Sequence, residues 1–390
     1  MSHGQRLPVL ALGLGLGLCH LAAEERAPVT VVRTPDGGIQ PQAAVDSRGR
    51  VRLIYFKGKP EAGDVYYAEQ LPRSDRFLPA IRVNTTIGAA VALGSIRGAH
   101  LALGKKDRVH VAWMASPEVP KAIINGEGQA PMLYARMNDS GSAFEPERNV
   151  MTWTGGLDGG GSVAADPQGN VYVTWHGVPP DNKDAEAGRA VFLARSRDDG
   201  KTFAREEQVS PANSGACGCC GMRAFADQQG HLMILYRAAI EQKDRNMTLL
   251  VGDPARSGLQ SLTLSRWRAT TCLMSSASLA EGGGSVLAAW EQQNQIQFTP
   301  LDPSLPSLTL ALEPSGEGKR QHPTVARNAK GEILLAWTEN TGWDKGGSLA
   351  WQRFDAAGKA LEAPEHRDGV PAWGLVAAVA KPDGSFVIFY

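Results

Sequence analysis

The sequence has no excess charge of either sign and no long hydrophobic segment. Its 390 residues contain 40 Lys and Arg against 40 Asp and Glu, so the formal net charge is zero. Proteins that bind nucleic acids usually carry a basic excess, and we therefore expect no nucleic-acid partner. No segment beyond the amino-terminal region contains 18 uninterrupted apolar residues, so no transmembrane span is expected.

Several familiar catalytic motifs are also missing. The chain contains no Gly-rich phosphate-binding loop, no H-E-x-x-H metal motif and no G-x-S-x-G nucleophile motif, and it therefore predicts no cofactor. Hydrophobic residues make up 43% of the chain and charged residues 21%, which is too apolar for a disordered protein. The 44 Gly and 24 Pro predict many turns and argue against a helical bundle.

The amino terminus reads as a processing signal. Residues 1–23 combine a basic start, an apolar run over Leu7–Leu18 and the small residues Ala22 and Ala23, a pattern typical of a secretory signal peptide. Cleavage near this point leaves residues 24–390 as one domain, and we expect it to be periplasmic or secreted. Cys19 raises a lipoprotein as the weaker alternative, because Leu precedes it where a lipobox needs a small residue.

One pattern recurs seven times along the rest of the chain. Each copy has a short apolar strand, a turn that often contains Asp and Gly, and an alternating strand that ends in an aromatic residue. These aromatic residues are spaced by 47 to 62 residues, the period of a β-propeller blade, and they are Tyr55, Trp113, Trp175, Tyr236, Trp290, Trp337 and Tyr390. Further strands between the copies give about four strands per blade. The sequence predicts an all-β propeller with seven blades; six are the alternative if one hairpin is an outer addition.

The last copy ends at Tyr390 after only two strands. The segment Pro28–Thr34 is the one strand-like stretch before the first copy. We therefore expect it to supply the missing outer strand and to join the two ends of the ring, which leaves only short, protected strand edges.

A second motif lies within the third repeat. Ser196, Asp198, Gly200, Thr202 and Phe203 match S-x-D-x-G-x-T-[FW], which is the Asp-box. Met137–Phe144 is a degraded copy in the preceding repeat. We interpret the box as structural: the Asp caps a tight turn, the Gly supplies an unusual backbone angle and the aromatic residue packs beneath.

With this motif and the repeats, the chain resembles the sialidase-like superfamily of BNR, or Asp-box, repeat propellers. The resemblance implies a ligand site on the channel face that takes a glycan or another anionic, hydroxyl-rich molecule. It also implies exo-glycosidase activity as one reading, although fold alone does not define function. Two other classes stay open: a noncatalytic binding or scaffold module, and a cysteine-based metal or redox protein.

The candidate site residues come from loops that open on one face of a propeller. These are the loops before each innermost strand and those between the second and third strands. The predicted ligand-binding residues are Arg97, His100, His176, Arg223, Arg237, Arg320, His322, Trp343 and Trp373. If the protein is hydrolytic, the general acid and its partner carboxylate would come from Asp158, Glu291 and Glu339.

These residues also have an ordinary structural explanation. The arginines can join neighbouring blades through the carboxylates, the histidines can solvate the channel mouth, and the tryptophans can pack in loops. Their convergence nevertheless favours a glycan or small anionic ligand. A monomer is expected.

Four cysteines remain after removal of the signal, namely Cys217, Cys219, Cys220 and Cys272. An even count in an exported chain first predicts disulfides, with Cys272 tied to the other three, and no metal is assigned. The alternatives are a copper or zinc site that adds Met222, Met274 or a histidine, and a redox-active thiol.

Overall fold

The computed structural model of the chain describes Met1 and residues 27–390, except residues 73, 181, 183–187, 255, 257, 283 and 303–309. The predicted signal peptide, Met1 apart, lies outside these residues. Two short 3-10 turns, η1 (Pro35–Gly37) and η2 (Lys105–Asp107), are the helical segments of the described part of the chain. Neither has the length and apolar character that a membrane crossing requires. The remaining regular structure is strand.

The strands form seven blades, each a twisted, largely antiparallel sheet. Blade 1 contains β2 (Ile39–Val45), β3 (Val51–Lys59), β4 (Ala62–Glu69) and β5 (Ile81–Arg82). Blade 2 contains β6 (His100–Leu103), β7 (Val109–Met114), β10 (Met132–Arg136) and β11 (Arg148–Asn149), and its loop carries a hairpin of β8 (Ala122–Ile124) and β9 (Glu127–Gln129). Blade 3 contains β12 (Gly161–Ala165), β13 (Val171–Gly177), β14 (Ala190–Ser196) and β15 (Glu207–Gln208).

The other four blades follow the same order from the inside outward. Blade 4 contains β16 (Arg223–Ala226), β17 (Leu232–Arg237), β18 (Met247–Asp253) and β19 (Gly258–Ser265). Blade 5 contains β20 (Ala277–Gly282), β21 (Ser285–Gln292) and β22 (Gln295–Leu301). Blade 6 contains β23 (Arg320–Arg327), β24 (Ile333–Glu339), β25 (Gly347–Phe354) and β26 (Glu365–Val370). Blade 7 contains β27 (Ala377–Ala380), β28 (Phe386–Phe389) and β1 (Val29–Val32).

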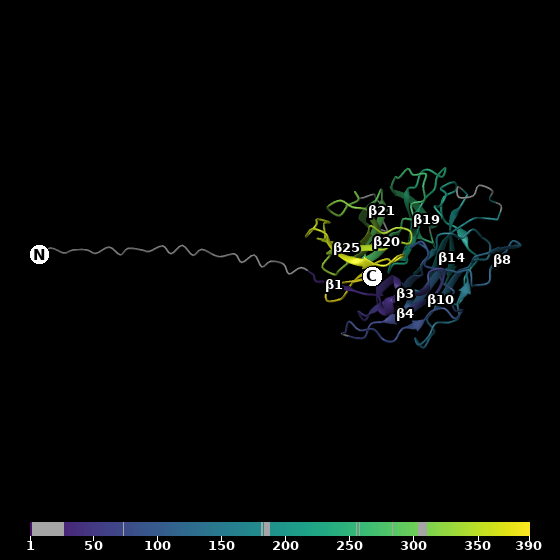
Figure 1. Cartoon of the computed structure of the whole chain (residues 1–390), viewed down its shortest axis with the longest axis horizontal. Helices are drawn as coiled ribbons and strands as arrows, with labels where there is room; N and C mark the ends of the chain where they lie inside the picture. Colours follow the sequence, from purple (N-terminus) through teal and green to yellow (C-terminus); the bar gives the residue numbers. More distant parts are fainter. Residues whose placement is uncertain are drawn as a thin grey trace.

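The blades close into a ring around a central channel (Figure 1). Each innermost strand contacts that of the next blade, and β27 of blade 7 contacts β2 of blade 1. The closure uses the amino-terminal strand, because β1 pairs in parallel with β28 from Val29 opposite Phe386 to Val32 opposite Phe389. The prediction of seven blades joined by the amino terminus is therefore confirmed.

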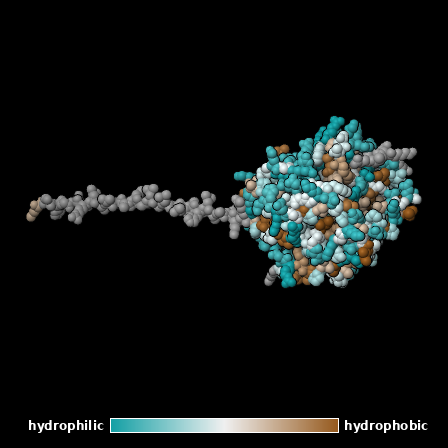
Figure 2. Space-filling view, viewed as in Figure 1, coloured by the Kyte–Doolittle hydropathy of each residue, from teal (hydrophilic) through white to brown (hydrophobic). Residues whose placement is uncertain are grey.

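The repeated aromatic residues pack between blades. Trp175, which has none of its surface exposed, contacts a cluster that combines Tyr134 of blade 2 with Val163 and Phe192 of blade 3. Because both faces of each blade are covered by a neighbour, apolar side chains occupy both faces of the inner strands. The face of the molecule in Figure 2 is mostly hydrophilic, with hydrophobic residues scattered across it.

The Asp-box lies between β14 and β15, which are the third and fourth strands of blade 3. Asp198 accepts hydrogen bonds from the Thr202 backbone N–H at 2.8 Å and from the Thr202 hydroxyl at 2.6 Å. Ser196 donates to the same carboxylate at 2.7 Å. Gly200 has a φ of 77°, and a Cβ there would lie 1.8 Å from the Tyr134 hydroxyl, so only glycine fits.

The aromatic residue of the box also has its predicted role. Phe203 packs edge-on against Tyr134 of blade 2, with ring centroids 4.8 Å apart. Through this contact the box joins blade 3 to blade 2.

Replacing Asp198 by Ala should lower the free energy of unfolding by about 1–2 kcal/mol, because the turn loses its capping hydrogen bonds. Urea denaturation of the mature protein measures this, with Asp198→Asn as the control that retains one acceptor oxygen and loses less. Ligand binding should be unchanged. A variant that keeps its melting temperature but no longer binds ligand would contradict the structural role.

Candidate functional site

The central channel holds two cavities at its opposite ends. The cavity at the mouth, where the innermost strands begin, has a volume of about 110 Å³ and is lined by residues of blades 1, 2, 4, 5, 6 and 7. The cavity at the other end, beside the hairpin turns, has a volume of about 560 Å³. Arg223, the first residue of β16, lines both and therefore lies between them.

Several polar groups that line the larger cavity already have partners. Asp46 accepts hydrogen bonds from Arg50 and Arg52, and Asp107 accepts one from Ser47. Arg327 donates to the Gly331 carbonyl at 3.2 Å and to Ser285. These pairs hold the turns together, so they offer little free hydrogen-bonding capacity to a ligand.

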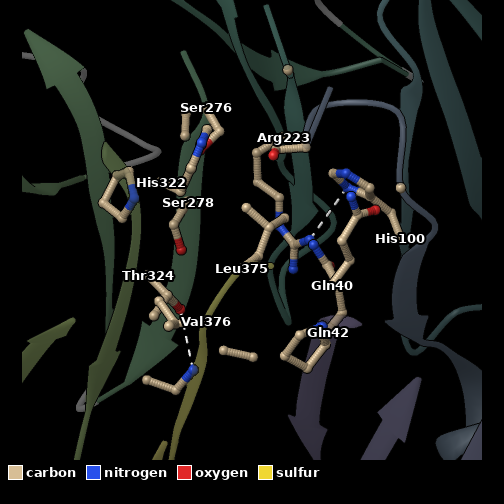
Figure 3. A pocket seen from close by; sticks show the side chains of 18 of the residues that line it. Gln40, Gln42, His100, Arg223, Ser276, Ser278, His322, Thr324, Leu375 and Val376 are labelled. Atoms are coloured by element: carbon tan, nitrogen blue, oxygen red, sulfur yellow. Dashed lines mark hydrogen bonds between the residues drawn. The ribbon is translucent and has the colours of Figure 1, made fainter. Parts of the chain in front are cut away.

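Arg223 has a different environment. One of its Nη atoms donates to Oε1 of Gln42 and lies 3.3 Å from Nδ1 of His100, and no carboxylate in the described chain forms an ion pair with it. Its Nε is buried and has no hydrogen-bond partner among the described residues. Burial lowers the pKa of Arg223 to about 10, so the side chain remains charged at neutral pH. Figure 3 shows it extending toward Gln42 and His100 across the channel.

His100 completes this side of the mouth. Its Nδ1 lies 2.8 Å from the Ser162 hydroxyl, and burial, assisted by the Arg223 charge, holds the pKa of His100 well below its usual value. Gln40 lies beside it, with Nε2 donating to the carbonyls of Ala92 at 2.7 Å and Trp373 at 3.1 Å. Its Oε1 is buried without a partner.

The opposite wall comes from blades 5 and 6. His322 lies with Nδ1 3.2 Å from the Ser276 hydroxyl and 3.3 Å from Oε1 of Glu291. The same carboxylate oxygen accepts the backbone N–H groups of Ser276 at 2.9 Å and His322 at 2.8 Å. Figure 3 shows Ser276, Ser278, His322 and Thr324 along this wall, facing the arginine side. Glu291 therefore fixes the wall rather than lining the cavity.

Several of the predicted ligand-binding residues do not line the mouth. The Arg97 guanidinium donates to the Asp158 carboxylate at 2.8 Å and to the Asp158 carbonyl at 2.6 Å, which ties the loop before blade 2 to the one before blade 3. Trp343 is 58% exposed. A Cβ on Gly94 would lie 3.0 Å from its ring, which places Trp343 over the loop that covers the mouth.

Two further arginines hold blades together. Arg237 donates to Ser275 at 2.8 Å and to the carbonyls of Arg245 at 2.8 Å and Glu291 at 2.6 Å, and it lies over the Trp267 ring. Arg320 donates to the carbonyls of Pro314 and Ser315 at 2.9 and 2.6 Å, and its Nε lies 3.6 Å from Glu339. Arg237 and Arg320 therefore have the structural role, in which an arginine holds neighbouring segments together, rather than a ligand-binding role.

The remaining candidates lie behind the mouth. Glu339 accepts a hydrogen bond from Trp337 at 2.8 Å and approaches His366 at 3.2 Å. Trp373 presents its backbone carbonyl to Gln40, while its indole N–H is buried without a partner. His176 is fully buried at the end of β13, and neither ring nitrogen forms a hydrogen bond within the described chain.

Stability should fall in mild acid because His176 is buried. Burial, with Arg189 as a second cause, lowers its pKa to about 4, whereas an unfolded histidine titrates near 6.5. Between these values the unfolded chain binds more protons, so the free energy of unfolding falls by about 3 kcal/mol as the pH drops from 6.5 to 4. The low pKa of His100 acts in the same direction.

Urea unfolding from pH 4.5 to 7.5 measures this effect. His176→Leu should flatten the profile, and the same substitution at the exposed His366 should not. Equal slopes in the two variants would show that His176 does not cause the acid sensitivity.

Sequence reasoning missed Gln40 and Ser276 at the mouth. Gln40 and His322 occupy equivalent bulges at the start of their strands, with φ values of 52° and 53° and a shifted register. Bulges re-aim side chains and often lie beside sites. The signal was present in the sequence, because each precedes a proline near the start of an inner strand, Gln40-Pro41 and His322-Pro323.

The four cysteines converge at the edge of the mouth but form no disulfide among the described residues. All four are free thiols, and the shortest Sγ–Sγ distance is 3.1 Å, between Cys217 and Cys220. A disulfide requires about 2.05 Å. Cys272 approaches Cys219, as predicted for the two segments, but the predicted covalent bond is not present.

The chain is thus a seven-bladed β-propeller with an Asp-box and a charged channel mouth, and the predicted all-β propeller architecture is confirmed. No protein-family model and no curated protein matches the sequence. Among solved structures, an α-L-arabinanase from Penicillium chrysogenum complexed with arabinobiose matches with a TM-score of 0.53 and 12% identity, over 85% of this chain and 98% of that one.

Two other solved structures are similar. A protein of unknown function from Dyadobacter fermentans matches with a TM-score of 0.52 and 12% identity, over 82% of this chain and 95% of that one. A microbial sialidase, Hz136, matches with a TM-score of 0.48 and 14% identity, over 84% of this chain and 70% of that one. At these identities the likeness describes the fold alone.

Proposed function

We propose that the protein binds the terminal group of a small anionic, hydroxyl-rich ligand, such as an acidic sugar, at the channel mouth. The observation that carries this proposal is Arg223, a guanidinium between the two cavities that has Gln42 and His100 as neighbours and no ion-pair partner in the described chain. We further propose that it acts as an exported, monomeric protein, in keeping with its amino-terminal sequence.

The charge of Arg223 supports an anionic ligand. Removing a cation from water without a counter-charge is costly, and the cost is offset when an anion completes the pair. A carboxylate suits this guanidinium, because the planar fork can form two parallel hydrogen bonds with it. His100 is kept neutral, so the attraction would come from Arg223 itself.

The size of the mouth supports a terminal group rather than the interior of a polymer. Sites for drug-sized molecules usually measure about 300–1,000 Å³, whereas this cavity is about 110 Å³. It suits the anionic end of a sugar, with the remainder of the ligand outside. Ser276, Ser278 and Thr324 on the facing wall offer hydroxyl groups that suit a sugar's own hydroxyls.

The lining favours recognition over hydrolysis. Glycosidases usually place two carboxylates across the scissile bond. No Asp, Glu or Tyr is among the described residues that line the mouth, and Arg223 is its one arginine. Asp158 is paired with Arg97, and Glu291 and Glu339 are held by other groups. The arabinanase structure carries arabinobiose on a similar fold, which supports a carbohydrate ligand for this one.

Calorimetry of the mature protein tests the proposal with a panel of sugars. D-Glucuronate and N-acetylneuraminate should bind, D-glucose should not, and added salt should weaken binding because the attraction is ionic. Equal binding of glucose, or no binding of any acidic sugar, would contradict the proposal. Release of free sugar from a sialylated oligosaccharide would instead show hydrolysis.

A further inference from the structure

A cluster of sulfur atoms lies beside the proposed binding site without belonging to it. Cys217 and Cys220 are buried, and Cys219 is partly buried between them. The Cys217 Sγ lies 3.1 Å from that of Cys220 and 3.5 Å from that of Cys219, and all three sulfur atoms lie within 4.8 Å of one another. Cys272, which is exposed, reaches Cys219 from the loop before blade 5.

These separations are close to those of metal ligands. Four thiolates about 2.3 Å from a tetrahedral zinc ion lie about 3.8 Å apart, and a disulfide would bring two sulfur atoms to about 2.05 Å. The two Sγ–Sγ distances from Cys217 are therefore slightly shorter than those in a filled zinc site and much longer than a disulfide bond. One ion at the centre of Cys217, Cys219 and Cys220 would move these three sulfur atoms little, and Cys272 would turn in from its exposed loop as the fourth ligand.

The backbone already holds the sulfur atoms in place. The Cys217 N–H donates to the Arg237 carbonyl at 2.8 Å, and the Cys220 N–H closes a turn onto the Cys217 carbonyl at 3.1 Å. The Gly221 N–H donates to the Ser275 carbonyl at 2.8 Å, which joins the two loops. The Ser275 hydroxyl donates to the Cys220 Sγ at 3.3 Å. A hydroxyl that donates to sulfur, as Ser275 does, stabilises a thiolate in a metal site.

A buried positive charge lies next to these groups. All three hydrogen bonds of the Arg237 guanidinium go to neutral oxygen atoms, of Ser275, Arg245 and Glu291. A buried guanidinium needs negative charge nearby; the Glu291 carboxylate already supplies some to Arg237, and the thiolates of a metal site would add more where neutral thiols do not. The charge of the surroundings therefore favours the metal-bound form.

We propose that Cys217, Cys219, Cys220 and Cys272 bind one thiophilic d10 cation, Cu(I) or Zn²⁺. Thiolate ligands select these ions over harder ones. Each cysteine that binds loses its proton to the solvent as the metal enters. The exposed Cys272 is the last ligand to close, which leaves an entrance for the ion. This site is separate from sugar recognition and does not depend on it.

Metal titration of the reduced, full-length mature chain tests the proposal. We expect one equivalent of Zn²⁺, measured by competition with a chromophoric chelator, or one of Cu(I), measured against bathocuproine disulfonate under anaerobic conditions. Co²⁺ should give the visible bands of a tetrahedral thiolate complex. Elemental analysis of protein purified without added metal identifies the resident ion, because a thiolate site binds Cu(I) more tightly than Zn²⁺ whichever metal it holds.

Variants separate ligands from neighbours. Cys217→Ser and Cys220→Ser should weaken binding at least about 100-fold, more than the loss of an outer contact costs. Arg223→Gln should keep the metal and lose the acidic sugar, so failure of one site can be told from failure of the other. If a serine variant does not fold, alkylation of the unaltered protein decides, because bound metal should protect these thiols from iodoacetamide as mapped by mass spectrometry.

Two results would overturn the metal site. One is a reduced, folded protein that binds neither ion and whose four thiols react equally with and without metal. The other is a Cys217–Cys220 or Cys219–Cys272 disulfide that forms and reduces reversibly while no metal is retained. That second result would identify a redox pair instead.

Discussion

Arg223→Met is expected to abolish recognition of acidic sugars while the protein remains folded. The side chain is the cation of the mouth, and truncating one member of a desolvated charge pair costs about 2–5 kcal/mol of binding free energy. This corresponds to a loss of affinity on the order of 30-fold to several thousand-fold. Calorimetry with D-glucuronate measures it directly.

The same variant should keep or gain stability without ligand. Methionine fills a similar volume and carries no charge, so the unfavourable burial of an unpaired guanidinium disappears. Arg97→Met is the matched control, because Arg97 is paired with Asp158 outside the mouth and its loss should leave sugar affinity unchanged. A large loss of melting temperature in Arg223→Met, or equal loss of binding in both variants, would assign Arg223 a structural role.

Trp175→Ala is expected to have the largest effect on stability. The indole is fully buried between blades 2 and 3, and its N–H donates to Thr154 at 3.0 Å. Truncation of a buried tryptophan leaves a cavity and usually costs about 3–5 kcal/mol. Urea denaturation should show a lower midpoint for unfolding of the whole ring, because the two blades share this contact.

Trp343→Ala provides the control for the same substitution. Trp343 is 58% exposed, so its loss should change stability by no more than about 0.5 kcal/mol. Comparable losses in the two variants would mean that the repeated aromatic residues do not form the contacts between blades.

The architecture could be predicted from the sequence because its signals are local and repeated. The seven hairpins and the Asp-box turn each depend on residues close together in the chain, as with Asp198 and Thr202. The closing strand could be predicted because Pro28–Thr34 is the one strand-like stretch before the first copy. The repeats then predict how the blades are arranged, because the innermost strand of each blade contacts that of the next one. The strand count was less regular: blades 5 and 7 contain three strands, and in blade 5 Leu312 only bridges to Phe298.

The site was predicted less well because side-chain direction depends on distant partners. Arg237 ends β17, Arg320 begins β23 and Arg97 lies in the loop before β6, yet backbone carbonyls and the Asp158 carboxylate take their hydrogen bonds. Arg223 differs because its hydrogen bond goes to the neutral Gln42 side chain, and no carboxylate in the described chain pairs with it. Residue type and spacing do not tell an arginine that holds blades together from one that is open to a ligand.

Two glutamates also have roles that residue type and spacing do not predict. Glu206 accepts hydrogen bonds from the backbone N–H groups of Thr152, Trp153 and Thr154. Burial alone would raise the pKa of Glu206, but these hydrogen bonds outweigh it and the pKa is lowered. Glu147 makes the equivalent contacts with Thr85 and Thr86 one blade earlier. Both residues clamp the chain as it passes between blades, and each looked like an ordinary surface glutamate in the sequence.

A crystal structure of the mature protein grown with D-glucuronate tests the central claim most directly. The account predicts the sugar carboxylate within about 3 Å of the Arg223 guanidinium, with hydroxyl groups facing Ser276, Ser278 and Thr324. Glucuronate bound elsewhere, or a channel mouth that holds only water at a saturating concentration of the sugar, would contradict it.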